Sequence, residues 1–244
     1  DTMTSDGDEI YLSYKGVRKS FNGVPALDGV DLEVRRSEIF GFIGPDGAGK
    51  TTLIRMAMGI TDPDSGECTL LGMKDRRRAR ISAGYVPQLF SLYTDMTVNE
   101  NIALFGSLYG TAKETALQRA EDILKRTGLW PFRERLVGNL SGGMKQKLAL
   151  ASGLMHTPEI LFLDEPTTGV DPVARREFWA ILYELNRQGL TIIVSTPYMD
   201  EAELCTRKMF ISNGRILDVG TSEELLDRYD KKILVLELDE RRAK

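Results

Sequence analysis

The sequence contains little of what several classes of protein require. Its two cysteines, Cys68 and Cys205, lie far apart and outside any C-x-x-C pair, which argues against a disulfide scaffold or a zinc site and suits a reducing cytosol. No apolar run approaches the roughly 18 residues of a membrane-spanning helix, and no charged-then-apolar signal peptide opens the chain. At 244 residues the chain is long enough to bury a full apolar core without disulfides or a structural metal.

The charge balance is mildly acidic, with a formal net charge of −4 and a pI near 5.3. Nothing in it favours broad nucleic-acid binding, so we expect no nucleic-acid partner. The dense basic run at 76–80 is interpreted as a solvated loop, with a membrane-proximal patch as the alternative. Because the chain starts at Asp1 and ends in a charged stretch, we expect it to be a piece of a longer protein.

Residues 44–52 fit the pattern G-x-x-x-x-G-K-[ST], a loop whose backbone N–H groups surround nucleotide phosphates. The apolar run 39–43 predicts a buried strand before the loop, and 51–58 has the composition of a helix after it. We expect Lys50 to reach the β- and γ-phosphates of ATP and the Thr51 hydroxyl to ligate Mg²⁺. The predicted nucleotide contacts of this loop are Gly44, Asp46, Gly47, Ala48, Gly49, Lys50, Thr51 and Thr52.

A second apolar run, 160–163, ends in Asp164 and Glu165. Ligands of open α/β sheets lie at the carboxyl ends of strands, which is where these two carboxylates would emerge. We expect Asp164 to hold Mg²⁺ through water and Glu165 to act as the general base that polarises the attacking water. A merely solvated strand end is the alternative, and the phosphate loop upstream favours the functional interpretation.

The organisation of the chain is predicted from its periodicity. Helical spacing recurs from 111 to 127, Gly128 suits a helix C-cap, and Ser141 suits the N-cap of the next helix. We predict an α/β fold with a P-loop NTPase (RecA-like) core at 1–88 and 156–230. An antiparallel β flank and a helical subdomain inserted at 89–155 complete the cassette at 1–230. Residues 231–244 are interpreted as a linker or the start of a C-terminal segment, strand-like at 233–236.

The span from about Ile10 to Tyr229 resembles the nucleotide-binding domain of ATP-binding cassette (ABC) transporters. Residues 140–146, Leu-Ser-Gly-Gly-Met-Lys-Gln, are similar to the signature sequence of the family. The resemblance implies that Ser141, Gly142 and Gly143 grip the γ-phosphate of an ATP held by a second cassette. A hydroxyl and glycine N–H groups at a helix N-terminus suit that task physically.

Three further positions match family motifs. Gln88 matches the Q-loop glutamine, which implies a role in sensing Mg²⁺ and the attacking water and in linking to the membrane subunit. Asp171 matches the D-loop aspartate that crosses the dimer interface. Phe21 stands where the family has an aromatic residue that stacks on adenine, and a simple core phenylalanine is the alternative.

Residues 144–146 and 198–203 resemble the drug and polysaccharide export branch of the family. In that branch the ATPase is often encoded apart from an integral membrane permease. The resemblance implies a peripheral protein at the cytoplasmic face of the inner (plasma) membrane that hydrolyses Mg-ATP to drive export. A soluble ABC protein acting on ribosomes or DNA is a weaker alternative, because Thr167-Thr168-Gly169-Val170-Asp171 departs from that branch's pattern.

One residue departs from the family. Pro197 stands where a histidine usually contacts the γ-phosphate, and proline has neither an N–H nor a polar side chain. The only histidine, His156, lies in a turn before the 160–163 strand and is not a substitute. The chain resembles the N-terminal half of bacterial exporters that fuse two cassettes, so we expect a second cassette in a tandem or heterodimer, with the better catalytic site on that partner. A homodimer, which would carry Pro197 in both sites, is the other possible arrangement. The alternative is an ATP-dependent clamp or regulatory cassette with little hydrolysis of its own.

Overall fold

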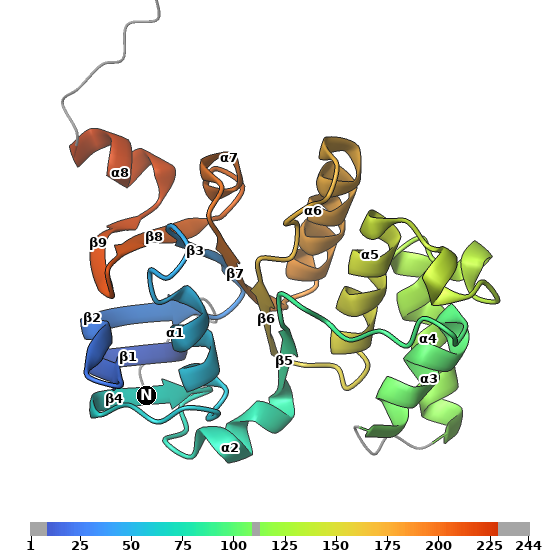
Figure 1. The fold of residues 1–244 in the computed structure, drawn as a ribbon, viewed down its shortest axis with the longest axis horizontal. Helices are drawn as coiled ribbons and strands as arrows, with labels where there is room; N and C mark the ends of the chain where they lie inside the picture. The colour runs from blue at the N-terminus through green and yellow to red at the C-terminus, as the bar shows by residue number, and fades with distance from the viewer. Residues whose placement is uncertain (1–8, 109–112, 229–244) are drawn as a thin grey trace, which may run out of the picture.

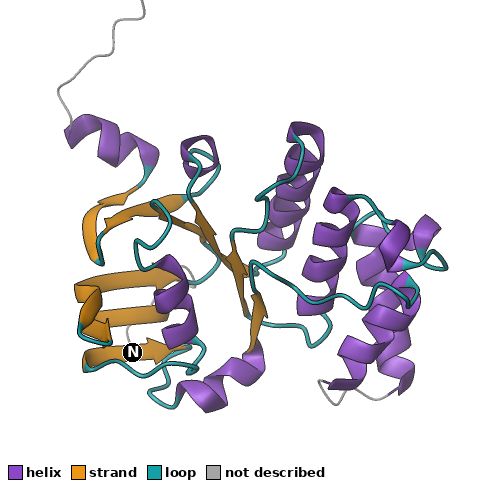
Figure 2. Cartoon of the chain, in the orientation of Figure 1, coloured by secondary structure: helices purple, strands orange, loops and turns teal. Residues whose placement is uncertain are grey.

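The computed structural model describes residues 9–108 and 113–228. Figure 1 shows a β-rich end and a helical end joined by one sheet that runs through the middle of the molecule, and Figure 2 separates the two by colour. The strands are β1 (Ile10–Phe21), β2 (Val24–Arg35), β3 (Ile39–Ile43), β4 (Ser65–Leu70), β5 (Ala83–Val86), β6 (Ile160–Asp164), β7 (Thr191–Thr196), β8 (Arg207–Ser212) and β9 (Arg215–Gly220). The α-helices are α1 (Lys50–Ala57), α2 (Arg76–Ala79), α3 (Val98–Leu108), α4 (Lys113–Arg126), α5 (Gly142–Gly153), α6 (Pro172–Arg187), α7 (Met199–Ala202) and α8 (Ser222–Arg228).

The central sheet has the strand order β5-β6-β7-β3-β8-β9, in which only β9 runs antiparallel to its neighbour. Strands β3, β6 and β7 are buried at every position, as expected for parallel strands covered on both faces. Successive residues enter different cores: Phe162 packs with α1 and the β flank, whereas Leu161 and Leu163 pack with α5 and α6. The continuous apolar runs in the sequence therefore serve two cores at once.

The antiparallel flank is a separate sheet of order β2-β1-β4. Its first hairpin turns through Asn22 and Gly23, both with positive φ (49° and 79°), the conformation of a two-residue turn that matches strand twist. The sheet packs against α1 through the core formed by Tyr14, Val30 and Leu53. The predicted α/β fold with an antiparallel flank is confirmed.

The segment 89–155 contains α3, α4 and α5 and lies at the helical end of the molecule (Figure 1). Gly128 has φ +71° just past α4, and the Ser141 hydroxyl accepts a hydrogen bond from the Met144 N–H as the N-cap of α5. Both capping predictions are confirmed. The strand-like residues 233–236 lie outside the described residues. Within the described ranges, no helix combines the length and hydropathy needed to cross a bilayer.

The basic run 76–80 is solvated at Arg77, Arg78 and Arg80, as predicted, but the prediction that it is a loop is wrong. Asp75 caps a short helix, α2, and the Arg76 side chain is largely buried. Its guanidinium donates to the Met56 carbonyl and to Asp62, each at 2.6 Å, so it ties the end of α1 to the loop that follows. Local charge density could not reveal this role because the partners lie 14 and 20 residues away.

Candidate functional site

Four loops meet at the carboxyl edge of the central sheet. Gln88 follows β5, Glu165 follows β6, Pro197 follows β7, and the phosphate loop 44–49 follows β3 (Figure 1). Their order along the edge follows the strand order β5-β6-β7-β3, and the parallel register keeps the strand ends level, since Asp164 pairs with Ser195 and Thr196 pairs with Ile43. The topology therefore brings together positions that are up to about 150 residues apart in the chain.

The phosphate loop has little room for side chains. Gly49 has φ +112°, and a Cβ on it would lie 2.9 Å from the Ala26 carbonyl oxygen of β2. Lys50 begins α1, and its ammonium donates to the carbonyls of Gly44 and Pro45 at 2.6 and 3.0 Å. The loop thus presents backbone N–H groups and a helix N-terminus, the arrangement that binds phosphate.

A cavity of about 360 Å³ lies above this loop. Most of the predicted site residues line it: the nucleotide contacts Asp46, Gly47, Ala48, Gly49, Lys50, Thr51 and Thr52, and the predicted catalytic residues Gln88 and Glu165. Ala26 of β2 also lines it and was not predicted, because an alanine in an alternating strand carries no sequence signal for a site. Its carbonyl, rather than its side chain, is what approaches Gly49.

Glu165 is held by polar contacts in an uncommon backbone conformation. Its φ is +49°, a region that residues other than glycine rarely adopt and that often marks functional positions. The side chain is 10% exposed, lies 3.4 Å from the Lys50 ammonium, and accepts a 2.9 Å hydrogen bond from the Gln88 amide. The Ser195 hydroxyl accepts from the Glu165 N–H at 3.1 Å. The carboxylate therefore faces the phosphate loop.

Asp164 is buried beside the first turn of α1. Its carboxylate accepts hydrogen bonds from the Ser195 hydroxyl at 2.5 Å and from the Thr51 hydroxyl at 3.2 Å. Ser195 was not predicted as part of the site, although the parallel pairing of the two strands could have suggested it. The two oxygen-bearing side chains of Asp164 and Thr51 suit Mg²⁺, which needs few protein ligands and keeps water and phosphate as the others. Across the described ranges, no three acidic, histidine or cysteine side chains gather into a denser cation site.

The signature residues lie elsewhere. Among the described residues that line the phosphate-loop cavity, none comes from 141–143. Gly142 is exposed, with nothing within 4 Å of a Cβ placed on it, whereas Gly143 is buried against Ala174 of α6. Asp171 caps α6 by accepting from the N–H groups of Val173 and Ala174, both at 3.0 Å. The N-termini of α5 and α6 therefore lie side by side on one surface.

This close approach gives a stability prediction. A Cβ on Gly143 would stand 2.6 Å from that of Ala174, so Gly143→Ala is expected to cost about 1–3 kcal/mol of unfolding free energy through overpacking. Gly142→Ala is the matched control in the same helix turn and should change stability by less than about 1 kcal/mol. Urea unfolding of both variants measures the difference, and equal midpoints would contradict the packing argument.

Two further residues considered in the sequence analysis, Phe21 and His156, do not line the phosphate-loop cavity. Phe21 is 48% exposed at the β1–β2 turn, with the Lys19 ammonium 5.5 Å from its ring, so the core alternative is wrong. His156 lies at the opposite edge of the sheet, where its Nε2 is 3.0 Å from the carbonyl oxygen of Ala83, the first residue of β5. Burial lowers the pKa of His156. Because position 197 follows β7 at the carboxyl edge of the sheet, His156 at the amino edge cannot replace a side chain there. Burial likewise raises the pKa of Cys68 and Cys205 to about 12, which leaves both thiols protonated.

A strand, a glycine-rich loop, a helix N-terminus and two carboxylates at the end of β6, which β7 separates from β3, define a P-loop nucleotide-binding domain. The ABC transporter family profile matches residues 27–168. The chain belongs to the ABC transporter family and is an ATP-binding domain of it.

Several relatives are similar over most of the chain. The probable multidrug ABC transporter ATP-binding protein YbhF of Escherichia coli K12 is 43% identical over 219 residues, which make up 88% of this chain and 38% of YbhF. The Nod factor export ATP-binding protein I of Ralstonia nicotianae is 41% identical over 219 residues, 88% of this chain and 68% of that protein. The linearmycin resistance ATP-binding protein LnrL of Bacillus subtilis is 35% identical over 221 residues, 89% and 71% of the two chains.

A solved structure has the same architecture. CbiO1 of Clostridium perfringens, part of the ABC transporter complex cbiONQ, superposes with a TM-score of 0.80 at 28% identity, covering 90% of this chain and 92% of that one. A cassette in its ADP conformation superposes with a TM-score of 0.81 at 24% identity, which supports the fold alone.

Proposed function

We propose that this chain binds and hydrolyses Mg-ATP between two cassettes and thereby drives export through a separate integral membrane permease. The observation that carries the proposal is the separation of the phosphate loop from the signature residues on one chain. The phosphate loop lines its own cavity, while Ser141 and Gly142 stand outside it at an exposed helix N-terminus. A face-to-face pair of cassettes would bring the signature residues of each chain to the phosphate loop of the other.

The residues divide the chemistry between them. Lys50 would exchange the carbonyls of Gly44 and Pro45 for phosphate oxygens, which releases Glu165 from its ion pair. Glu165 would then accept the proton of the attacking water, and Gln88, already bonded to Glu165, would orient that water. Thr51 and Asp164 would hold Mg²⁺, which neutralises phosphate charge when bound. Phe21 would stack on the adenine ring, and Asp171 would face the partner cassette.

The direction and cargo come from the relatives. YbhF is named for multidrug transport and two other relatives for Nod factor export and linearmycin resistance, so export of an organic compound is the proposal for this chain. The chain spans only 38% of YbhF, and a second cassette in the same or another polypeptide is therefore part of the proposal. The protein would lie peripherally at the cytoplasmic face of the inner membrane.

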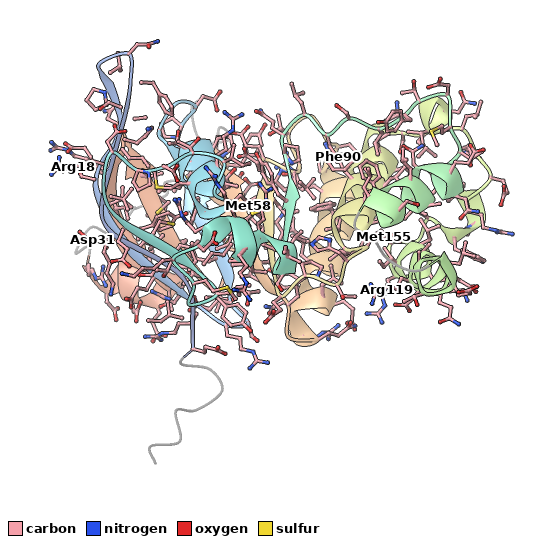
Figure 3. All side chains as sticks on the ribbon, turned by 90° about the horizontal axis from the view of Figure 1, so that it is seen from below. Arg18, Asp31, Met58, Phe90, Arg119 and Met155 are labelled. Carbon is pink, nitrogen blue, oxygen red and sulfur yellow. The ribbon has the colours of Figure 1, made fainter. Side chains whose placement is uncertain are left out.

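The surface next to Gln88 suits contact with the permease. A groove of about 350 Å³ runs between residues 88–94 and helix α5. Phe90 lies where the sheet meets the helical end (Figure 3), and Leu89 is 88% exposed. Because Gln88 both lines this groove and bonds Glu165, a permease segment seated here would act on the Glu165 carboxylate through Gln88.

Lys50 gives the direct test of ATP binding. Lys50→Ala removes a charge-assisted contact worth about 1.5–3 kcal/mol, so the dissociation constant of ATP should rise about 10–100-fold. Calorimetric titration measures it, with the exposed Lys74→Ala as the control that should bind normally. Unchanged ATP binding by Lys50→Ala would remove this loop as the nucleotide site.

A second candidate function is an ATP-dependent clamp or regulatory cassette, and Pro197 favours it. Both candidates use the same binding residues, so turnover separates them. We would measure Mg-ATPase activity of the chain alone across protein concentration, with Glu165→Gln as the blank. Turnover rising with the square of concentration supports a working homodimer. ATP binding with turnover at the blank supports the clamp, or one impaired half of a pair.

A further inference from the structure

A buried carboxylate outside the predicted site connects two of its loops. Glu201 belongs to α7, a single turn that follows the Pro197 segment, and it is 1% exposed. Burying a carboxylate is costly unless hydrogen bonds and a nearby cation satisfy it.

Donors from three other elements converge on the Glu201 carboxylate. The Thr196 hydroxyl at the end of β7 donates to one oxygen at 2.6 Å. The Thr167 hydroxyl and the Trp179 indole N–H, the latter at 3.2 Å, donate to the other oxygen. The Arg175 guanidinium of α6 lies 3.7 Å from that same oxygen and supplies the nearby positive charge.

The two threonines that donate to Glu201 lie next to two loops of the predicted site. Thr167 lies two residues after Glu165, on the loop that holds Glu165 in its left-handed conformation. Thr196 lies one residue before Pro197. We propose that Glu201 is a positioning residue, which fixes the Glu165 loop against the Pro197 segment and links both to α6. The inference rests on the proposed hydrolysis for its kinetic consequence, but the contacts themselves do not.

Glu201→Gln keeps the shape of the side chain and exchanges one acceptor for a donor. The side chains of Thr167, Trp179 and Thr196 can then no longer all donate to residue 201. Arg175 also loses its buried counter-charge. The expected result is a kcat lowered about tenfold or more, from the value of a hydrogen bond to a charged group. The ATP dissociation constant should stay within about twofold, because no atom of Glu201 lines the phosphate-loop cavity. Glu203→Gln, exposed in the same segment, is the matched control.

A purely structural role would give a different result. It would lower the unfolding midpoint of Glu201→Gln and leave kcat per folded molecule unchanged, which overturns the proposal. Thr167→Val covers the case in which Glu201→Gln does not fold, since it removes one donor and keeps the other contacts. Thr167→Val should lower kcat alone, and the double variant should lose no more than Glu201→Gln does.

Trp179 supplies a readout that does not need turnover. The chain has two tryptophans, so in Trp130→Phe the single indole N–H signal in a nitrogen–proton NMR spectrum belongs to the group that donates to Glu201. Adding Mg-ATP should shift that signal, and the shift should persist in Glu203→Gln and vanish in Glu201→Gln. A shift that survives Glu201→Gln overturns the proposal. Absence of turnover with the expected NMR behaviour would count against hydrolysis by this chain and not against Glu201.

Discussion

Glu165→Gln is expected to abolish steady-state ATP hydrolysis while leaving ATP binding intact. A general base contributes about 10²–10⁴ in rate, so turnover should fall by that factor or to the detection limit. The amide keeps the shape of the carboxylate and still accepts from Gln88, and Lys50 keeps its bonds to two loop carbonyls. Removing a proton acceptor is then the main chemical change. Measuring phosphate release at saturating Mg-ATP, with calorimetric binding in parallel, tests both halves of the expectation.

Strand β6 offers a matched control for this variant. Glu159 precedes the strand at the far edge of the sheet and Glu165 follows it at the site edge. Glu159→Gln makes the same chemical change and should leave turnover within about twofold. Because Pro197 is expected to lower the starting rate, the comparison is repeated in the Pro197→His background, where a loss is easier to measure. Turnover of Glu165→Gln equal to that of the parent protein would remove Glu165 as the base.

The sequence alone predicted the parts of the fold that depend on local pattern. Runs such as 39–43 and 160–163 predict buried strands because both faces of a covered parallel sheet need apolar side chains. Ser141 and Gly128 predict helix ends because capping is a property of a few adjacent residues. The phosphate loop belongs to this class, since one contiguous segment supplies its glycines and lysine.

The contacts that the sequence did not predict join residues far apart in the chain. Ser195 meets Asp164, and Glu201 meets Thr167, only because β6 and β7 are neighbours in the sheet. Arg76 was misjudged for the same reason, as its partners belong to α1 and the loop after it. A buried carboxylate such as Glu201 also resembles any surface glutamate in sequence, because its burial depends on the packing of α6 and α7.

Pro197→His is expected to raise ATP turnover of the isolated chain by about 10²–10³, the typical value of one donor to a developing oxyanion. The residue follows β7 directly, where the Gly44 N–H of the phosphate loop donates to the Thr196 carbonyl at 3.3 Å. A side chain at 197 therefore starts beside the first residue of that loop. Histidine restores a side-chain N–H at this point, and ATP binding should change little because the other contacts remain.

Pro197→Ala distinguishes the side chain from the backbone. Alanine restores the backbone N–H and the freedom of φ but adds no polar group, so its turnover should stay near that of the parent chain. An equal gain for alanine and histidine would assign the effect to the backbone. No gain for histidine would mean that the side chain at 197 does not limit the rate.

The size of the increase in ATP turnover caused by Pro197→His also shows whether the chain works as a homodimer or with a second, different cassette. In a homodimer both sites contain Pro197, so both improve and the full factor should appear, with turnover rising as the square of chain concentration. In an assembly with a second, intact cassette, one site already works. Repairing the other can then raise the total rate by no more than about twofold. Measuring Pro197→His first alone and then with the second cassette therefore separates a weak homodimer from one half of an asymmetric pair.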